Sequence, residues 1–216
     1  MTDAALSLAV NDTIDGFTVV RVLGSEHASR TFLVRRSIGA EVVVLKYCRP
    51  QSLEAAVLQQ VSHPGVCQLL GQGGEPDSPY MLLSNYGQRT LRICVEQGIA
   101  VKELRDFVLQ IAAALEALHT QGFAHGDLRP EHVLIAPNQQ AVLIDLHCAY
   151  RLDSKPQAAY YSGGSLAYIS PERIRGVILG ENLSPSSASD YYSLGVLIFQ
   201  MLSGQLPFAD ETQELL

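Results

Sequence analysis

The sequence is poor in positive charge. Lysine and arginine together number 15 among 216 residues, and the formal net charge is −7. No run of basic residues occurs, which argues against a nucleic-acid surface or a polybasic patch for anionic lipids. The N-terminus has no charged segment followed by an apolar one, and no stretch of about 18 apolar residues could span a bilayer. We therefore expect a cytoplasmic protein, or the cytoplasmic part of a larger one, without nucleic-acid or membrane partners.

Paired cysteines are also missing. No two of the four cysteines form a C-x-x-C pair, and in a chain of this size the scatter favours buried, reduced thiols over disulfides or zinc ligands. The hydrophobic content of 47% is enough for a substantial core, as one domain or as two small lobes. The cysteines are Cys48, Cys67, Cys94 and Cys148.

The first part of the chain has the pattern of a β-sheet. Residues 1–13 lack a clear period and are expected to form a loose leader. A helical pattern starts near Pro50 and ends before His63, and the glycine-rich segment 71–77 is expected to be a loop. Strands are predicted at residues 17–23, 31–34, 41–47, 66–70 and 80–84, of which the first three form an antiparallel meander.

The second part has longer helical patterns. Apolar residues recur at helical spacing over residues 104–119, and a strongly apolar helix is predicted over residues 190–202. Between them, a polar loop precedes a predicted hairpin with its turn at Pro137-Asn138. The sequence thus divides into a leader at 1–13, a β-rich lobe at 14–86 and a helical lobe at 87–216.

Two carboxylates stand on either side of this hairpin. Asp127 lies in the polar loop before it, and Asp145 directly follows its second strand. Carboxylates on loops that a hairpin holds in place are suited to chemistry on a metal-bound phosphate. In such chemistry one carboxylate orients a hydroxyl and the other holds Mg²⁺.

These motifs resemble those of the protein kinase family. Residues 125–135 resemble the catalytic loop H-R-D-L-x-x-x-N, and Asp145-Leu146-His147 stands where D-F-G is usual. The motifs follow in the family's order from about Phe17 to Phe208. The other matching segments are 23–31 (glycine-rich loop), 43–46 (V-A-I-K), 164–172 (A-P-E) and 190–195 (start of the central helix).

The resemblance implies an α+β fold with two lobes. The N-lobe would hold a five-stranded antiparallel sheet and one helix, and the C-lobe would be mainly helical. The chain stops at Leu216, so we expect the C-lobe to lack the helices that follow its long central helix. It is then either a segment of a longer, multi-domain protein or a lobe that another chain covers. The closest likeness is to bacterial serine/threonine kinases, and Ser165 favours serine or threonine as substrate.

The resemblance also implies roles for four catalytic residues. Lys46 would contact the nucleotide phosphates and pair with Glu54; the alternatives are an edge lysine reaching into solvent and a solvated helix glutamate. Asp127 would orient the substrate hydroxyl and accept its proton, while Arg129 would keep a positive charge beside the transferring phosphate.

The implied cofactors are ATP and Mg²⁺, with Mn²⁺ as an alternative. Asp145 would be the main metal ligand. His132, at the usual asparagine, would either bind metal or form a hydrogen bond with Asp127. The implied nucleotide-binding residues are Leu23, Gly24, Thr31, Val44, Lys46, Leu83, Ser84, Asn85 and Leu134.

Departures from the family's motifs keep several functions open. Glu26 and Ser29 replace two loop glycines, and His147 replaces the glycine of D-F-G. One hypothesis is a weak serine/threonine kinase acting on a protein substrate. The second is a pseudokinase, a regulatory or scaffolding module that binds a partner protein. An incomplete chain without independent stability and a small-molecule kinase are the remaining alternatives.

Overall fold

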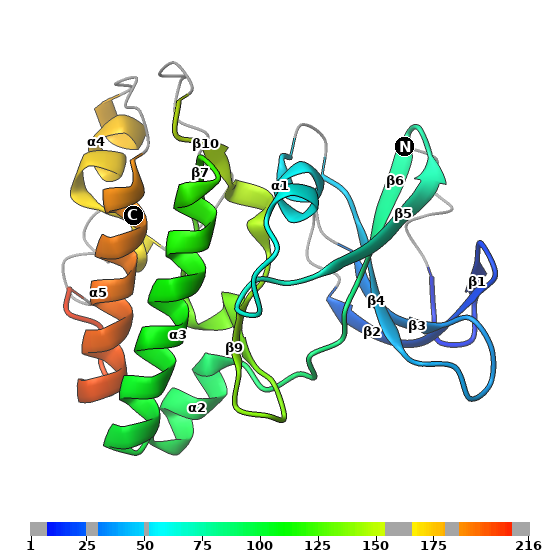
Figure 1. Ribbon diagram of the computed structural model, residues 1–216, viewed down its shortest axis with the longest axis horizontal. Coiled ribbons are helices and arrows are strands. Elements are labelled where there is room, and N and C mark those ends of the chain that lie inside the picture. The colour runs from blue at the N-terminus through cyan, green and yellow to red at the C-terminus, as the bar shows by residue number, and fades with distance from the viewer. Residues whose placement is uncertain (1–7, 25–29, 50–51, 154–165, 180–185, 209–216) are drawn as a thin grey trace. The chain divides into compact units, whose positions relative to one another are not determined.

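The structure is a computed structural model that describes residues 8–24, 30–49, 52–153, 166–179 and 186–208. The chain divides into two units (Figure 1). Unit 1 contains Met1–Gln59 and Cys67–Asn85, and unit 2 contains Gln60–Val66 and Tyr86–Leu216. The predictions for Glu26, Ser29, Pro50 and Ser165 fall outside the described residues.

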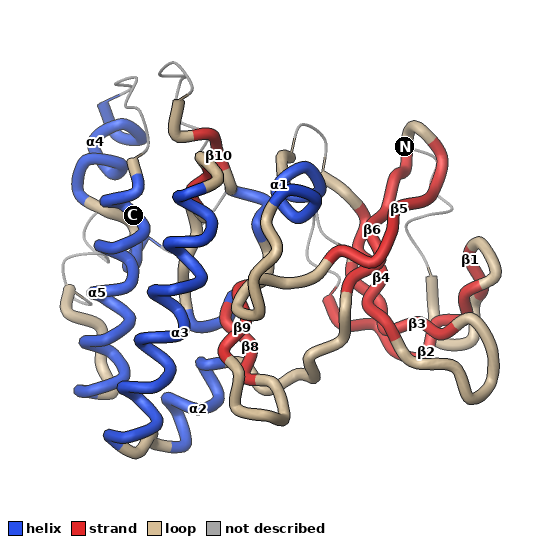
Figure 2. The backbone as a smooth tube through the Cα atoms, viewed as in Figure 1, coloured by secondary structure: helices blue, strands red, loops and turns tan. Residues whose placement is uncertain are grey.

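Among the described residues of unit 1, the strands form one six-stranded antiparallel sheet in the order β1-β2-β3-β4-β6-β5 (Figure 2). The sequence predicted five strands, and the structure adds the short edge strand β1, which pairs with the start of β2. The bounds are β1 Thr13–Ile14, β2 Phe17–Gly24, β3 Thr31–Arg35, β4 Val43–Tyr47, β5 Leu69–Glu75 and β6 Ser78–Leu83.

The sheet has a core face made by alternate residues. Phe32 pairs with Leu45 across β3 and β4, and both are buried with Val34. Successive strand residues point to opposite faces, so their neighbours in sequence lie on the other side of the sheet. The buried cluster contains Phe17, Val19, Phe32, Val34, Leu45 and Tyr80.

The prediction of a loop at residues 71–77 was wrong. Residues 71–75 belong to β5, which runs against β6. Glycine usually weakens a strand because it has no side chain to pack. Here the ring of Tyr80 occupies the position where a Cβ of Gly73 would lie. The Tyr80 hydroxyl then donates to Asp15 Oδ2 at 2.8 Å. The glycines make room for an aromatic side chain rather than marking a loop.

One short helix, α1 (Glu54–Gln60), completes the described elements of unit 1, to which all of its residues except Gln60 belong. Its first backbone N–H, that of Glu54, donates to Ser52 Oγ at 3.1 Å. This hydroxyl satisfies one of the N–H groups that the first turn of a helix leaves without a partner. The helix buries Val57 and Leu58 together with Glu54.

Unit 2 is mainly helical. The two predicted helices are present as α3 (Val101–Thr120) and α5 (Ser187–Ser203), which lie side by side in Figure 1. Their His119 and Tyr191 rings meet edge to face at 5.2 Å. The sequence reading did not foresee α2 (Leu91–Gln97) and α4 (Pro171–Leu179). No helix within the described ranges is both long and apolar enough to cross a bilayer.

Two small sheets fix the loops of unit 2. The predicted hairpin is formed by β8 (Val133–Ile135) and β9 (Ala141–Leu143), and β7 (Phe123–Ala124) pairs with β10 (Tyr150–Arg151). The backbone N–H of Leu143 also donates to the carbonyl of Gly65 at 2.8 Å. The described residues of unit 2 also form three single turns of 3₁₀ helix: η2 (Pro130–His132), η3 (Leu146–Cys148) and η4 (Leu166–Tyr168).

Candidate active site

Lys46 and Glu54 form a buried ion pair in unit 1. The Lys46 Nζ lies 2.7 Å from each carboxylate oxygen of Glu54, and the two side chains are 6% and 3% exposed. A lysine extending into solvent and a solvated glutamate are therefore excluded. The short separation of eight residues suffices because Glu54 is the first residue of α1.

Several predicted nucleotide-binding residues share the sheet face opposite the core cluster. Thr31 pairs with Gly24 on one side and with Lys46 on the other, and Val44 pairs with Leu83. Residues directly opposite in antiparallel strands present their side chains on the same face. The sheet thus places these five residues on one face, and Lys46 of the ion pair is one of them.

The other predicted nucleotide-binding residues lie at strand ends or in unit 2. Leu23 is partly exposed next to a register shift near the end of β2. Ser84 donates its backbone N–H to Gln68, and Asn85 is exposed. Leu134 is a half-buried residue of β8 in unit 2, bridged to Thr90. Their predicted role in binding nucleotide stays a prediction.

Asp190 of α5 fixes the polar loop of unit 2. Its carboxylate accepts the backbone N–H groups of His125 at 2.8 Å and Gly126 at 3.0 Å, and its Oδ2 lies 2.8 Å from His119 Nε2. Burial alone would raise the pKa of Asp190, but the interactions with His119, His125 and Gly126 lower it. The carboxylate is thus held as an anion inside the unit, where it braces the loop.

The braced loop presents Asp127. Its side chain is almost completely buried, and its backbone N–H donates to His125 Nδ1 at 3.3 Å. Burial is the main cause that raises the pKa of Asp127. A carboxylate with a raised pKa is a better proton acceptor than an exposed one. Arg129, predicted beside the phosphate, directs its Nε to His132 at 3.2 Å.

Both ring nitrogens of His132 are engaged. Nδ1 lies 2.7 Å from the backbone carbonyl oxygen of Asp127, and Nε2 accepts the Nε–H of Arg129. Burial lowers the pKa of His132 to about 4, so the ring is neutral with its proton on Nδ1. A metal could bind His132 only if one of these hydrogen bonds broke. Of the two predicted roles of His132, the structure therefore shows the hydrogen bond with Asp127, and the acceptor is the backbone carbonyl of Asp127.

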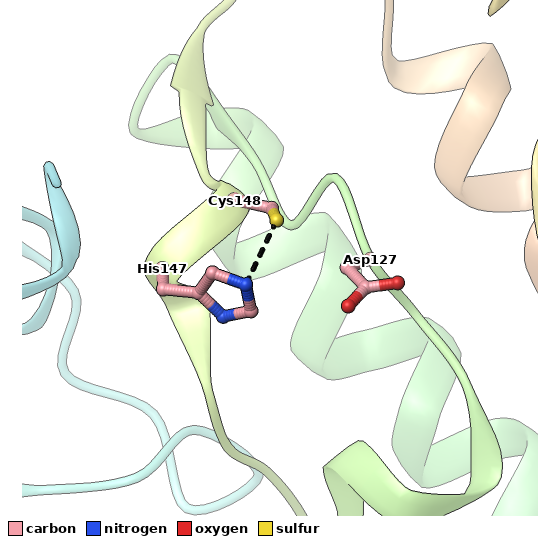
Figure 3. A group of neighbouring side chains, drawn as sticks. All are labelled: Asp127, His147 and Cys148. Atoms are coloured by element: carbon pink, nitrogen blue, oxygen red, sulfur yellow. Dashed lines mark hydrogen bonds between the residues drawn. The ribbon is translucent and has the colours of Figure 1, made fainter. Parts of the chain in front are cut away.

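Asp145 interacts with the histidine that replaces the D-F-G glycine. Its Oδ1 lies 2.6 Å from His147 Nδ1. The other ring nitrogen of His147, Nε2, lies 3.1 Å from Cys148 Sγ, and Figure 3 shows this contact. Burial alone would lower the pKa of His147, but its hydrogen bonds to Asp145 and Cys148 raise it to about 9. Sequence reasoning treated His147 only as a loss of backbone freedom and missed this pair. The spacing of acid and imidazole two residues apart was the available signal.

The donor atoms here fit Mg²⁺ only in part. Mg²⁺ takes oxygen ligands and keeps several waters, which suits the carboxylates of Asp127 and Asp145. Imidazole and thiol groups suit softer cations, and these come from His147 and Cys148. The two carboxylates are therefore the residues that could hold Mg²⁺, with Asp145 the more exposed of the two.

Comparison with known proteins identifies the family of the chain. The family model described as the protein kinase domain matches residues 17–215. The maternal embryonic leucine zipper kinase of Danio rerio is 30% identical over 94% of this chain and 31% of its own length. The serine/threonine-protein kinase AtPK1/AtPK6 of Arabidopsis thaliana is 26% identical over 90% of this chain and 43% of its own length.

The chain thus spans less than half the length of these curated relatives. Within that span the match includes the strand that carries Lys46, the braced loop of Asp127 and the helix that carries Asp190. The family model covers far more than half of the chain, and the chain therefore belongs to the protein kinase family.

Proposed function

We propose that this domain transfers the γ-phosphate of ATP to a serine or threonine hydroxyl of a protein, at a low rate. The observation that carries the proposal is the buried Lys46–Glu54 ion pair. A kinase needs this pair in place together with a metal-bound carboxylate before phosphoryl transfer can proceed. A buried pair is costly unless it is well bonded, and here each carboxylate oxygen accepts a hydrogen bond.

In this proposal the residues of each unit have separate tasks. In unit 1, Lys46 binds the nucleotide phosphates, and Thr31, Val44 and Leu83 on the same sheet face contact the nucleotide. In unit 2, Asp127 accepts the proton of the substrate hydroxyl, a task that its raised pKa favours. Asp145 holds Mg²⁺, which neutralises charge on the phosphates when it is bound.

The low rate follows from the two histidines of unit 2. His132 offers no lone pair for a second metal ion while both of its nitrogens are engaged. His147 occupies one oxygen of Asp145, so the metal must compete with a cationic imidazole. The same contacts favour the alternative function, a pseudokinase that binds a partner protein without phosphoryl transfer.

Transfer of radiolabel from ATP to a generic protein substrate tests the proposal. Asp127→Asn and Lys46→Met are expected to lower the rate at least about 100-fold, since each removes a group that acts in the transition state. Lys102→Met, at an exposed position of α3, is the matched control and should keep the wild-type rate. Equal signals from the wild type and Asp127→Asn would contradict the proposal.

The alternative function is separated by two further measurements. A weak kinase should gain activity in the His132→Asn variant, since asparagine restores an oxygen donor at that position. A pseudokinase should show no transfer in either form. Stabilisation of the wild type by ATP in a thermal unfolding assay, without any transfer, would favour the pseudokinase.

A further inference from the structure

We propose that Asp127, His147 and Cys148 form a three-ligand binding site for Zn²⁺. One carboxylate oxygen, one imidazole nitrogen and the thiol sulfur of these residues all lie within 4.8 Å of one another. Asp127 comes from the loop after β7, whereas His147 and Cys148 come from η3. Figure 3 shows the His147 ring and the Cys148 sulfur on one side and the Asp127 carboxylate across from them.

The separations of the ligand atoms can be compared with those in a tetrahedral zinc site. Zinc–ligand bonds of about 2.0–2.3 Å place the ligand atoms of such a site roughly 3.3–3.8 Å apart. His147 Nε2 and Cys148 Sγ are already 3.1 Å apart. The Asp127 carboxylate oxygen lies within 4.8 Å of both atoms and would have to move closer to them to complete the set. A water molecule would complete the fourth position, as in zinc sites with three protein ligands.

Asp145 acts on this site as a positioning residue. Histidines that bind metals usually donate their other ring N–H to a carboxylate, which fixes the ring and its tautomer. His147 meets this condition because its Nδ1 lies 2.6 Å from Asp145 Oδ1, which leaves Nε2 for the metal. Leu146 between the two is fully buried and holds η3 in place.

The donor set selects the metal. A thiolate and an imidazole favour Zn²⁺ over Mg²⁺, which prefers oxygen ligands. A metal binds the thiolate form of cysteine and an imidazole nitrogen without a proton, so metal affinity at this site should depend on pH. The acidic side chains Asp127 and Asp145 compensate the positive charge of the ion.

Zinc in this site would occupy the carboxylate proposed as the proton acceptor. An ion bound to Asp127 withdraws its lone pair from the substrate hydroxyl, so zinc would inhibit phosphoryl transfer. This consequence rests on the proposed function, whereas the binding site itself does not.

Cobalt(II) provides the direct test, because a thiolate bound to Co²⁺ gives a charge-transfer absorption in the near ultraviolet. The wild-type chain should bind one Co²⁺ with this absorption, and Zn²⁺ should displace it. Cys148→Ser should abolish the band, and His147→Gln should weaken binding at least about tenfold. Asp145→Asn should weaken binding about 10–100-fold yet keep the band, as expected for a residue that orients a ligand.

Cys48→Ser is the matched control, since Cys48 is a half-buried cysteine of unit 1. It should leave the Co²⁺ band unchanged. Circular dichroism must show native structure for each variant, and Cys148→Ala replaces Cys148→Ser if the latter does not fold. Absence of the band in the wild type, or its persistence in the Cys148 variant, would overturn the site.

An activity measurement separates this inference from the proposed function. Loss of the band in Cys148→Ser supports the site even if no protein kinase activity is found. If the wild type is active and binds Co²⁺ through Cys148, zinc should inhibit it at least about tenfold more strongly than the Cys148 variant. Equal inhibition of the two would overturn the inhibitory role.

Discussion

Units 1 and 2 bury charge in different ways. Unit 1 pairs one side chain with another, Lys46 with Glu54, and both partners are almost fully buried. Unit 2 buries Asp190 against backbone N–H groups and one histidine. Mutation can remove both side chains of the unit 1 pair together. The backbone N–H groups that face Asp190 cannot be removed in this way, so replacing Asp190 leaves them buried without an acceptor. The fold of unit 2 should therefore depend on its buried carboxylate more strongly than the fold of unit 1 depends on its ion pair.

The largest effect is expected for Asp190→Ala. This change leaves the N–H groups of His125 and Gly126, and the ring of His119, without their acceptor. A buried donor without a partner costs about 1–3 kcal/mol, so the free energy of unfolding should fall by more than about 3 kcal/mol. Urea denaturation of the whole chain measures it. Asp106→Ala, at a more exposed position of α3, should change the stability by no more than about 0.5 kcal/mol.

The pH dependence of stability tests whether the charge of the Asp190 carboxylate causes the loss of stability in Asp190→Ala. The pKa of Asp190 is lower in the folded chain than its ordinary value, so the unfolded chain takes up its proton first as the pH falls. The stability that Asp190 contributes is complete above the unfolded pKa and is lost as the pH falls through the folded pKa. The difference between the wild type and Asp190→Ala should therefore narrow under acid conditions. A difference that stays constant from neutral to acid pH would assign the effect to packing instead.

The ion pair of unit 1 should behave differently when both partners are replaced. Lys46→Met alone leaves Glu54 as a buried charge without its cation, and the expected loss is about 3–5 kcal/mol. The double variant Lys46→Met, Glu54→Leu removes both charges and should recover most of this loss. Chemical denaturation of both variants gives the comparison. If the double variant lost as much stability as the sum of its single changes, the contrast between the two units would be wrong.

Much of this architecture follows from the sequence, because regular spacing of apolar residues reports burial directly. Alternating apolar residues predicted β2, β3 and β4, and apolar residues at helical spacing predicted α3. The predicted bounds agree with the observed ones to within a few residues. The prediction for residues 71–75 was wrong because glycine by itself favours a loop. In the fold, the ring of Tyr80 on the neighbouring strand occupies the space that the missing Gly73 side chain leaves.

The candidate site was predictable in its residue types rather than in its contacts. The motif order placed Lys46, Asp127 and Asp145, and the ion pair was inferred because Glu54 stands where the family has its ion-pairing helix glutamate. The hydrogen bonds of His132 and His147 depend on rotamers and on the left-handed backbone of Asp145, which is set by the surrounding fold. Spacing along the chain carries no information on which ring nitrogen meets which oxygen.

Two glycines of unit 2 provide a smaller and closely matched comparison. Gly126 and Gly122 both have a φ of +79°, where a side chain is strained. A Cβ on Gly122 meets nothing within 4 Å, whereas a Cβ on Gly126 would collide with the backbone carbonyl oxygen of Cys148. Gly122→Ala should therefore cost about 1 kcal/mol and Gly126→Ala about 1–3 kcal/mol more. Thermal unfolding of the two variants measures the difference, and equal losses would mean that the loop moves away from Cys148 without cost.

The smallest effect is expected for the ion pair between Arg92 of α2 and Glu131 of η2. Its atoms are as close as those of the unit 1 pair, at 2.6 Å, but each side chain is 35% exposed. Water and salt screen exposed charges, so a double-mutant cycle with Arg92→Met and Glu131→Gln should give a coupling of about 0.2–1 kcal/mol. The coupling should decrease in 1 M salt, whereas that of Lys46 and Glu54 should persist, because burial limits screening. A coupling as large as that of the buried pair would indicate that contact distance, rather than burial, sets the strength of ion pairs in this protein.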